Sequence, residues 1–126
     1  MSGFAFDTNI VIDALLGLPE AREEIERAVR RGSRPWISRL VWIEVLSKGT
    51  PDQVQSATRM LNGFGTDELD AEIAARAAAL RRERPRLKVA DAIILATAML
   101  RGRVLVTRNT KDFPAEMPGV RIPYQL

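Results

Sequence analysis

The sequence predicts an α/β/α sandwich with a central, mostly parallel β-sheet. Short apolar runs, such as residues 4–6 and 104–106, alternate with longer segments of helical periodicity, which is the order expected of strand–helix–strand units. The apolar runs are continuous rather than alternating, as expected of strands that are covered on both faces. The chain of 126 residues has no internal repeat or linker, so we expect a single domain over residues 1–126.

The predicted elements alternate along the chain. Residues 20–31 have an apolar face, with acidic residues first and basic residues last, which complements the helix dipole. Residues 50–53 form a capping box, and residues 89–100 are apolar on nearly every side, as in a buried helix. We expect strands at 4–6, 36–37, 104–106 and 120–122, a short extended stretch near Leu69, and helices at 10–16, 20–31, 39–47, 51–62, 71–84 and 89–100.

The composition narrows the chemistry that this protein can perform. There is no cysteine and no histidine, which excludes disulfides, thiolate or imidazole metal sites, and Ser-His-Asp or Cys-His catalysis. A metal would be bound by oxygen atoms, which suit Mg²⁺ or Mn²⁺. The formal net charge of +3, from 19 basic and 16 acidic residues, permits a nucleic-acid partner but does not require one.

The sequence also predicts a cytoplasmic protein with no membrane partner. Residues 1–7 lack the basic start and the long apolar run of a signal peptide. The longest apolar stretch, residues 92–100, is too short to span a bilayer.

Three carboxylates lie where acidic residues are uncommon. Asp7 directly follows the first strand, at the end where parallel sheets bind their ligands. Glu44 has apolar neighbours on both sides, and such an acid is rarely buried unless it is paired or bound to a metal. Asp91 lies in the first turn of the buried helix, where the helix dipole stabilises a carboxylate.

Each of these acids also has a purely structural explanation. Asp7 could cap the next helix, and Glu44 could lie on a solvated stripe. Asp91 could cap its helix or pair with Lys88 or Arg86. If the three instead converge, they would repel one another, and a divalent cation would remove that conflict while activating water and clamping a phosphate oxygen.

At these positions the sequence resembles the PIN-domain family, and within it the VapC-like toxins of toxin–antitoxin pairs. The resemblance covers nearly the whole chain, and the order of its segments makes it fairly specific. It rests on Asp7-Thr8-Asn9 after the first strand, Glu44 in an apolar helix, Ala90-Asp91-Ala92-Ile93-Ile94 opening the buried helix, and Thr107-Arg108-Asn109-Thr110-Lys111-Asp112-Phe113 after a late strand.

The resemblance implies an endoribonuclease with an acidic cleft that binds Mg²⁺ or Mn²⁺. It further implies a toxin that forms a homodimer and is inhibited by a cognate antitoxin. Asp7, Glu44 and Asp91 match the family's catalytic, metal-binding acids. Many members have a fourth acid where this chain has Asn109. Asp112 is the alternative fourth acid, although it can also belong simply to the turn before Phe113.

Other residues are expected to support the site. Asn9 and Thr107 match polar positions that could orient the acids by hydrogen bonding. The basic residues Arg86, Lys88 and Arg108 are candidates for contact with RNA phosphates, or else belong to a solvated surface. The apolar residues Trp36, Trp42, Met60 and Phe64 are either core or part of a dimer or antitoxin surface.

Two other classes of function fit parts of the sequence. A non-catalytic PIN-like module that binds RNA or protein is favoured by the missing fourth acid. A phosphoacceptor receiver domain is also a small α/β fold with acids at strand ends. It needs paired acids after the first strand, however, and Asp7 stands alone there.

Overall fold

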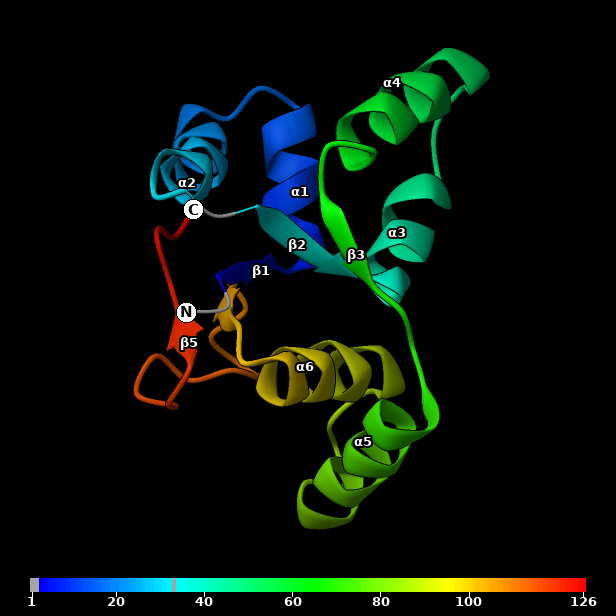
Figure 1. Ribbon diagram of the computed structural model, residues 1–126, viewed down its shortest axis with the longest axis vertical. Coiled ribbons are helices and arrows are strands. Elements are labelled where there is room, and N and C mark those ends of the chain that lie inside the picture. The colour runs from blue at the N-terminus through cyan, green and yellow to red at the C-terminus, as the bar shows by residue number, and fades with distance from the viewer. Residues whose placement is uncertain (1–2, 33) are drawn as a thin grey trace.

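A five-stranded, all-parallel sheet runs through the centre of the computed structural model, which describes residues 3–32 and 34–126 (Figure 1). The strands lie in the order β3-β2-β1-β4-β5, so the first strand is central. This arrangement confirms the predicted fold class. The strands are β1 (Phe4–Phe6), β2 (Pro35–Ser38), β3 (Gly65–Asp67), β4 (Val104–Val106) and β5 (Val120–Arg121).

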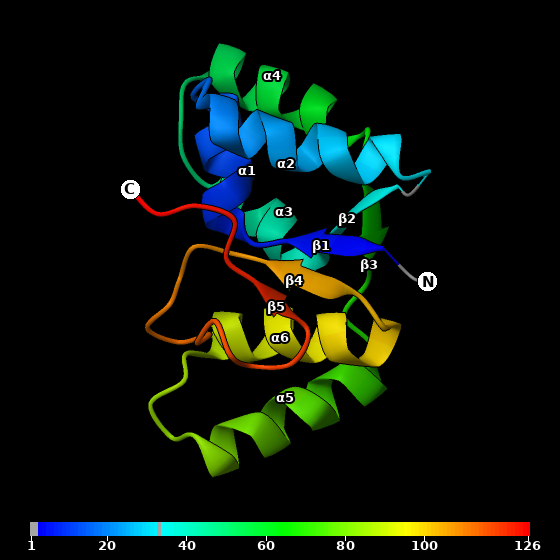
Figure 2. The same ribbon diagram turned by 90° about the vertical axis from the view of Figure 1, so that its left-hand side faces the viewer.

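Helices cover both sides of the sheet (Figure 2). On one side lie α1 (Thr8–Leu15), α2 (Pro19–Arg30) and α4 (Pro51–Leu61). On the other side α6 (Val89–Arg101) packs beneath β2 and β4, and α5 (Ala71–Glu83) packs against α6. The helix α3 (Arg39–Leu46) follows β2 directly and contacts α1, α4 and α6. In the described part of the chain, no helix is long and apolar enough to cross a membrane.

Local sequence signals set several of the helix ends. Thr50 and Gln53 form the predicted capping box, with bonds of 3.2 and 2.9 Å between their side chains and each other's backbone N–H groups. Asp70 caps α5 by accepting the Ile73 N–H at 2.9 Å. Gly102 ends α6 in the left-handed region, with φ of 67°, which glycine adopts without steric cost.

The structure corrects two predicted strand positions and one predicted burial pattern. The third strand is Gly65–Asp67, and Leu69 lies beyond it with 48% of its surface exposed. The helix α6 is not buried on every side, because Val89 and Met99 are 56% and 49% exposed. The last strand ends at Arg121, one residue earlier than predicted.

Of the four apolar residues expected either in the core or on an interaction surface, one is buried and three are half-buried. Phe64 is 6% exposed and makes an edge-to-face contact with Phe6, so it belongs to the core. Trp42 and Met60 are half-buried and pack against the core, and Trp36 is half-buried in the sheet.

The short strand β3 is held at the edge of the sheet by a stack of side chains around Trp36. Arg103 lies over the Trp36 ring at 3.7 Å from its centroid and forms a bidentate ion pair with Asp67, at 2.9 and 3.1 Å. The side chains of this ion pair are 10% and 6% exposed. The opposite partner of Trp36 in the sheet is Gly65, whose missing side chain leaves room for the indole ring.

Gly65→Ala is therefore expected to destabilise the protein by about 1–3 kcal/mol, the usual cost of overpacking a core. An added Cβ would lie 2.5–2.7 Å from three carbons of the Trp36 ring, which Arg103 covers. Urea unfolding measures the effect. Gly63→Ala is the control, because its Cβ meets only the Met60 carbonyl oxygen at 3.3 Å. An equal loss in both variants would contradict the explanation.

Candidate functional site

The three acids predicted from the sequence lie near one another at the carboxyl end of the central strands. Asp7 follows β1, is 4% exposed and serves as the N-cap of α1. Thr8 joins two of the acids, because its backbone N–H donates to Asp7 Oδ1 at 2.8 Å and its hydroxyl donates to Glu44 Oε1 at 2.5 Å. Asp91, in the first turn of α6, lies close enough to Asp7 and Glu44 for both charges to act on its ionisation.

The proximity of these acids changes the ionisation of Asp91. Its pKa is raised from 3.8 to about 6, first because burial disfavours the charged form and then because Asp7, Asp112 and Glu44 carry like charges nearby. Lys88 opposes the shift. Such a carboxylate gains more from a bound cation than an isolated surface acid does, since the cation offsets each of these unfavourable interactions.

Asp7 is the most deeply placed of the three. Burial raises its pKa, while the hydrogen bonds from Thr107 and Thr8 lower it in part. The Thr107 hydroxyl donates to Asp7 Oδ2 at 2.7 Å, and Thr107 itself is fully buried. This bond fixes the direction of the Asp7 carboxylate.

Asn9 supports the site one step further away than the sequence suggested. Its amide nitrogen donates to the Thr107 hydroxyl oxygen at 3.5 Å, and its amide oxygen accepts the Arg108 N–H at 3.4 Å. Asn9 therefore holds the loop that carries Thr107, instead of bonding directly to Asp7 or Asp91.

Asn109 and Asp112 form a closed turn after β4. Asn109 Nδ2 donates to Asp112 Oδ2 at 3.0 Å, and the Asp112 N–H donates back to Asn109 Oδ1 at 3.2 Å. Asp112 thus forms part of the turn before Phe113. Its carboxylate also raises the pKa of Asp91, so it faces the acidic site as well.

The three basic candidates occupy different surroundings. Arg108 forms a bidentate pair with Asp13, at 2.7 and 3.0 Å. Lys88 is exposed at the N-cap of α6, near Asp91. Arg86 is exposed in a hollow that also includes Asp112. Their contact with RNA phosphates remains a prediction.

Sequence reasoning missed Asp13 and Tyr124, which brace the loop after β4. Asp13 is 6% exposed, and its Oδ2 accepts both Arg108 Nε and the Tyr124 hydroxyl at 2.7 Å. These bonds, that from Arg108 first, lower the pKa of Asp13 despite its burial. The signal was present, because Asp13 lies in an apolar helix just as Glu44 does. Tyr124 offered no comparable pattern.

The donor atoms of the site suit a hard divalent cation. In residues 3–32 and 34–126, no three acidic side chains are assembled as a metal site, and Asp7 and Glu44 accept hydrogen bonds from threonines instead. The carboxylates around Asp91 nevertheless carry oxygen donors and negative charge, which are the features that hard divalent ions prefer. The residues present therefore fit such an ion.

The chain belongs to the PIN-domain family, whose PIN domain matches residues 4–115. It is similar to a chain of a toxin–antitoxin complex from Klebsiella pneumoniae, with 42% identity, a TM-score of 0.87, and coverage of 98% of this chain and 99% of that one. DNA-bound VapBC from Salmonella typhimurium (24% identity, TM-score 0.80, 97% of each chain) and FitAcB from Neisseria gonorrhoeae (20%, 0.78, 98% of this chain and 99% of that one) share the fold. A comparison with curated protein sequences gave no match.

Asp91→Asn is expected to stabilise the metal-free protein at neutral pH. Folded Asp91 keeps its proton up to about pH 6, whereas an unfolded aspartate loses its proton near 3.8. The folded state therefore binds more protons in this window, and stability falls as the pH rises through it. In EDTA, urea unfolding of the variant should need more denaturant than wild type at about pH 7.5 and the same amount at about pH 3.5.

Glu83→Gln removes one charge from an exposed position outside the site and serves as the control. The stability of this control variant to urea, relative to wild type, should be the same at about pH 3.5 and about pH 7.5. A wild type as stable as Asp91→Asn at neutral pH would contradict the raised pKa.

Proposed function

We propose that this protein is a metal-dependent endoribonuclease and the toxin of a toxin–antitoxin pair. The observation that carries the proposal is the grouping of Asp7, Glu44 and Asp91 where the central strand ends. Burial first, and then the like charges of Asp7, Asp112 and Glu44, raise the pKa of Asp91. The similarity of the whole chain to a component of a toxin–antitoxin complex supports the same function.

Asp7, Glu44 and Asp91 would hold Mg²⁺ or Mn²⁺ through their carboxylate oxygens. A divalent ion of this kind lowers the pKa of water and stabilises charge on a phosphate undergoing in-line displacement. Thr107 fixes the orientation of the Asp7 carboxylate, and Thr8 fixes that of Glu44. The ligands are thus oriented in advance of the reaction, so less order has to be imposed during it.

Asp112 is the best candidate for the fourth acid of the site. Asn109, at the position of the usual fourth acid, binds the Asp112 carboxylate and leaves it close enough to Asp91 to raise the pKa of that group. We assign Asn109 the role of positioning Asp112, and Asp112 the role of adding negative charge to the metal site.

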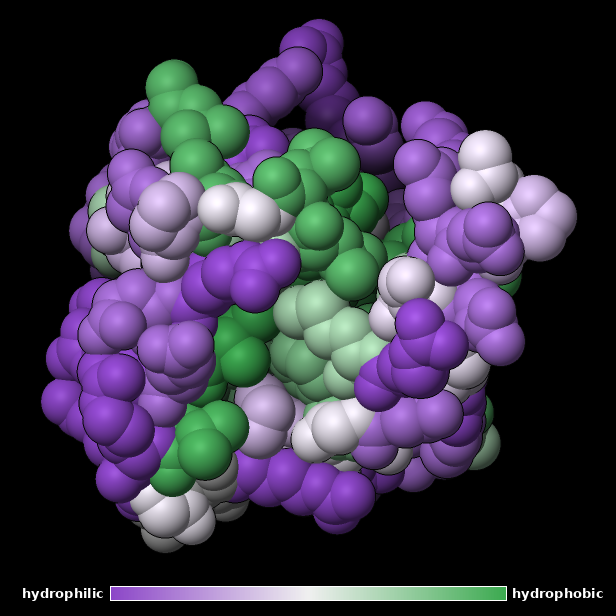
Figure 3. All heavy atoms as spheres, turned by 90° about the horizontal axis from the view of Figure 1, so that it is seen from above, coloured by the Kyte–Doolittle hydropathy of each residue, from purple (hydrophilic) through white to green (hydrophobic). Residues whose placement is uncertain are grey.

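The proposed antitoxin would cover a hydrophobic groove beside the site. Figure 3 shows an apolar hollow with hydrophilic side chains around it, on the side of the sheet that carries α1, α2 and α4. Next to α4, a groove is lined by Leu15, Val45 and the exposed residues Ile12 and Leu16, and it reaches Glu44. An apolar antitoxin segment in this groove would shield the acids. Sedimentation of the chain alone and with its antitoxin tests this pairing and the expected homodimer.

The wild-type protein is expected to cleave RNA only when Mg²⁺ or Mn²⁺ is present. Asp91→Asn should lower the cleavage rate at least about a hundredfold, because such a loss is typical of removing a group that stabilises transition-state charge. The measurement is cleavage of a mixed pool of structured RNAs, with EDTA as the metal-free arm. The charge-matched Glu83→Gln variant should keep its activity.

Three outcomes of this experiment would count against the proposal. Equal cleavage by wild type and Asp91→Asn would place the activity elsewhere. Cleavage in EDTA would exclude a role for the metal. RNA binding without cleavage by any variant, at any metal concentration, would favour a non-catalytic RNA-binding module.

Asp112→Asn should raise the Mg²⁺ concentration needed for half-maximal cleavage by about tenfold, the scale of effect seen when groups around metal ligands are removed. Asn109→Ala should shift it in the same direction by less, because Asp112 keeps its charge. The test is a Mg²⁺ titration of the cleavage rate. An unchanged titration in Asp112→Asn would limit Asp112 to its structural role in the turn.

A further inference from the structure

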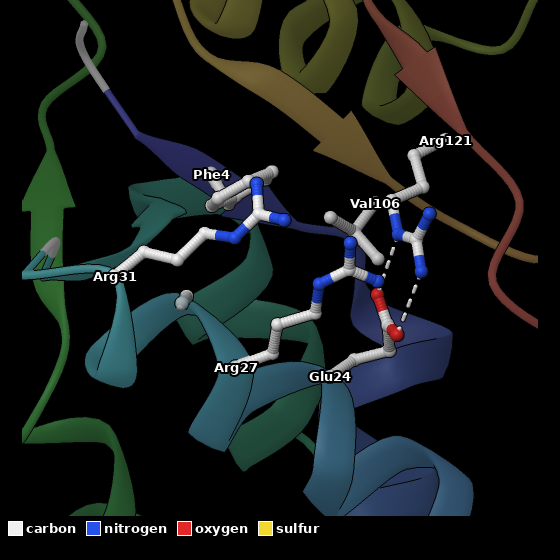
Figure 4. Close-up of a pocket in the computed structure, with 7 residues that line it drawn as sticks. Phe4, Glu24, Arg27, Arg31, Val106 and Arg121 are labelled. Atoms are coloured by element: carbon white, nitrogen blue, oxygen red, sulfur yellow. Dashed lines mark hydrogen bonds and ion pairs between the residues drawn. The ribbon is translucent and has the colours of Figure 1, made fainter.

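A second polar hollow lies away from the acidic site, between α2 and the sheet (Figure 4). Its volume is about 130 Å³, and Phe4 and Val106 contribute apolar surface to it. Three arginines line the hollow. Arg27 extends from the last turn of α2, Arg31 is the C-cap residue of that helix, and Arg121 extends from β5 on the other side. Asp7, Glu44 and Asp91 do not line it.

In the part of the chain that the structure describes, only one of these arginines forms an ion pair. Arg121 forms a bidentate pair with Glu24, at 2.7 and 3.0 Å, and the Glu24 side chain is only 11% exposed. Among the described residues, the guanidinium groups of Arg27 and Arg31 form neither a salt bridge nor a hydrogen bond. Arg31 caps α2 four residues after Arg27, so the two like charges repel each other, and a bound anion would offset this repulsion.

The charge of the hollow indicates which anion it suits. Three arginines and one glutamate leave a net charge of +2. A phosphate monoester carries about −1.5 to −2 at pH 7, whereas a carboxylate or a phosphodiester carries a single charge. The planar guanidinium fork also matches phosphate oxygens in pairs.

We propose that this hollow binds a phosphate monoester through Arg27, Arg31 and Arg121. The site goes beyond the proposed nuclease activity and does not depend on it. Glu24 holds Arg121 in place, and Arg27 and Arg31 supply guanidinium groups that form no ion pair with any residue that the structure describes. The monoester is either free phosphate or the terminal phosphate of a nucleic acid.

Isothermal titration calorimetry of the full chain in EDTA tests the proposal without any cleavage. The probes are inorganic phosphate, a 5′-phosphorylated trinucleotide and the same trinucleotide without the phosphate. The double variant Arg27→Gln/Arg31→Gln should weaken the binding of the phosphate probes at least about tenfold, as expected from losing charge-assisted hydrogen bonds. The control Arg59→Gln/Arg76→Gln removes the same charge from exposed helical positions outside the hollow.

The results separate the two sources of phosphate. Binding of inorganic phosphate that only the hollow variant weakens supports a site for any phosphate monoester. Binding of the phosphorylated trinucleotide alone supports a nucleic-acid terminus. Equal affinity for both trinucleotides would overturn the monoester assignment. Equal weakening by the two double variants, or no binding of either phosphate probe at millimolar concentration, would overturn the site.

Discussion

The burial of one carboxylate at the end of the central strand links the sheet to the site. Asp7 belongs to both, because its backbone N–H bonds to the Val106 carbonyl of β4 at 2.9 Å and its side chain bonds to Thr107 at 2.7 Å. Burying a charged group without hydrogen-bond partners costs roughly several kcal/mol. The hydrogen bonds from Thr8 and Thr107 are therefore needed for Asp7 to be buried at this position. The same bonds fix where Asp7 points, and thus tie the geometry of the site to the pairing of β1 with β4.

The acids near Asp7 raise the opposite problem, because the fold brings like charges together. Asp91 reduces the repulsion in part because it retains its proton to about pH 6. Glu44 is stabilised in part because it accepts a hydrogen bond from the Thr8 hydroxyl. Neither arrangement removes the repulsion. A site that is unfavourable when empty favours its cation when one binds, since the relief of repulsion adds to the affinity. The loop after β4 has to be rigid for this purpose, and Asp13, Arg108 and Tyr124 brace it from the side of α1.

A site residue could be predicted from the sequence when its charge was unusual among apolar sequence neighbours. Glu44 and Asp91 conflict with their apolar helices, and both proved to face Asp7. Asp13 shows the same conflict and was overlooked. The strand β3 could not be predicted from Gly65 and Asp67, which are poor strand formers. Its position is set by Trp36 and Arg103, which are distant in sequence. Likewise, nothing in residues 20–31 indicated that Arg27 and Arg31 would face β5.

The two polar sites of the protein follow from the alternation of side chains along one strand. Val106, the last residue of β4, turns its side chain into the arginine hollow. The next residue, Thr107, turns to the acidic site and bonds to Asp7. Successive residues of an extended chain point in opposite directions, so adjacent residues can serve surroundings of opposite charge. The buried chain between them separates the arginines from the acids, which would otherwise neutralise one another. Each site can therefore keep its excess charge, and with it an affinity for an ion of the opposite sign.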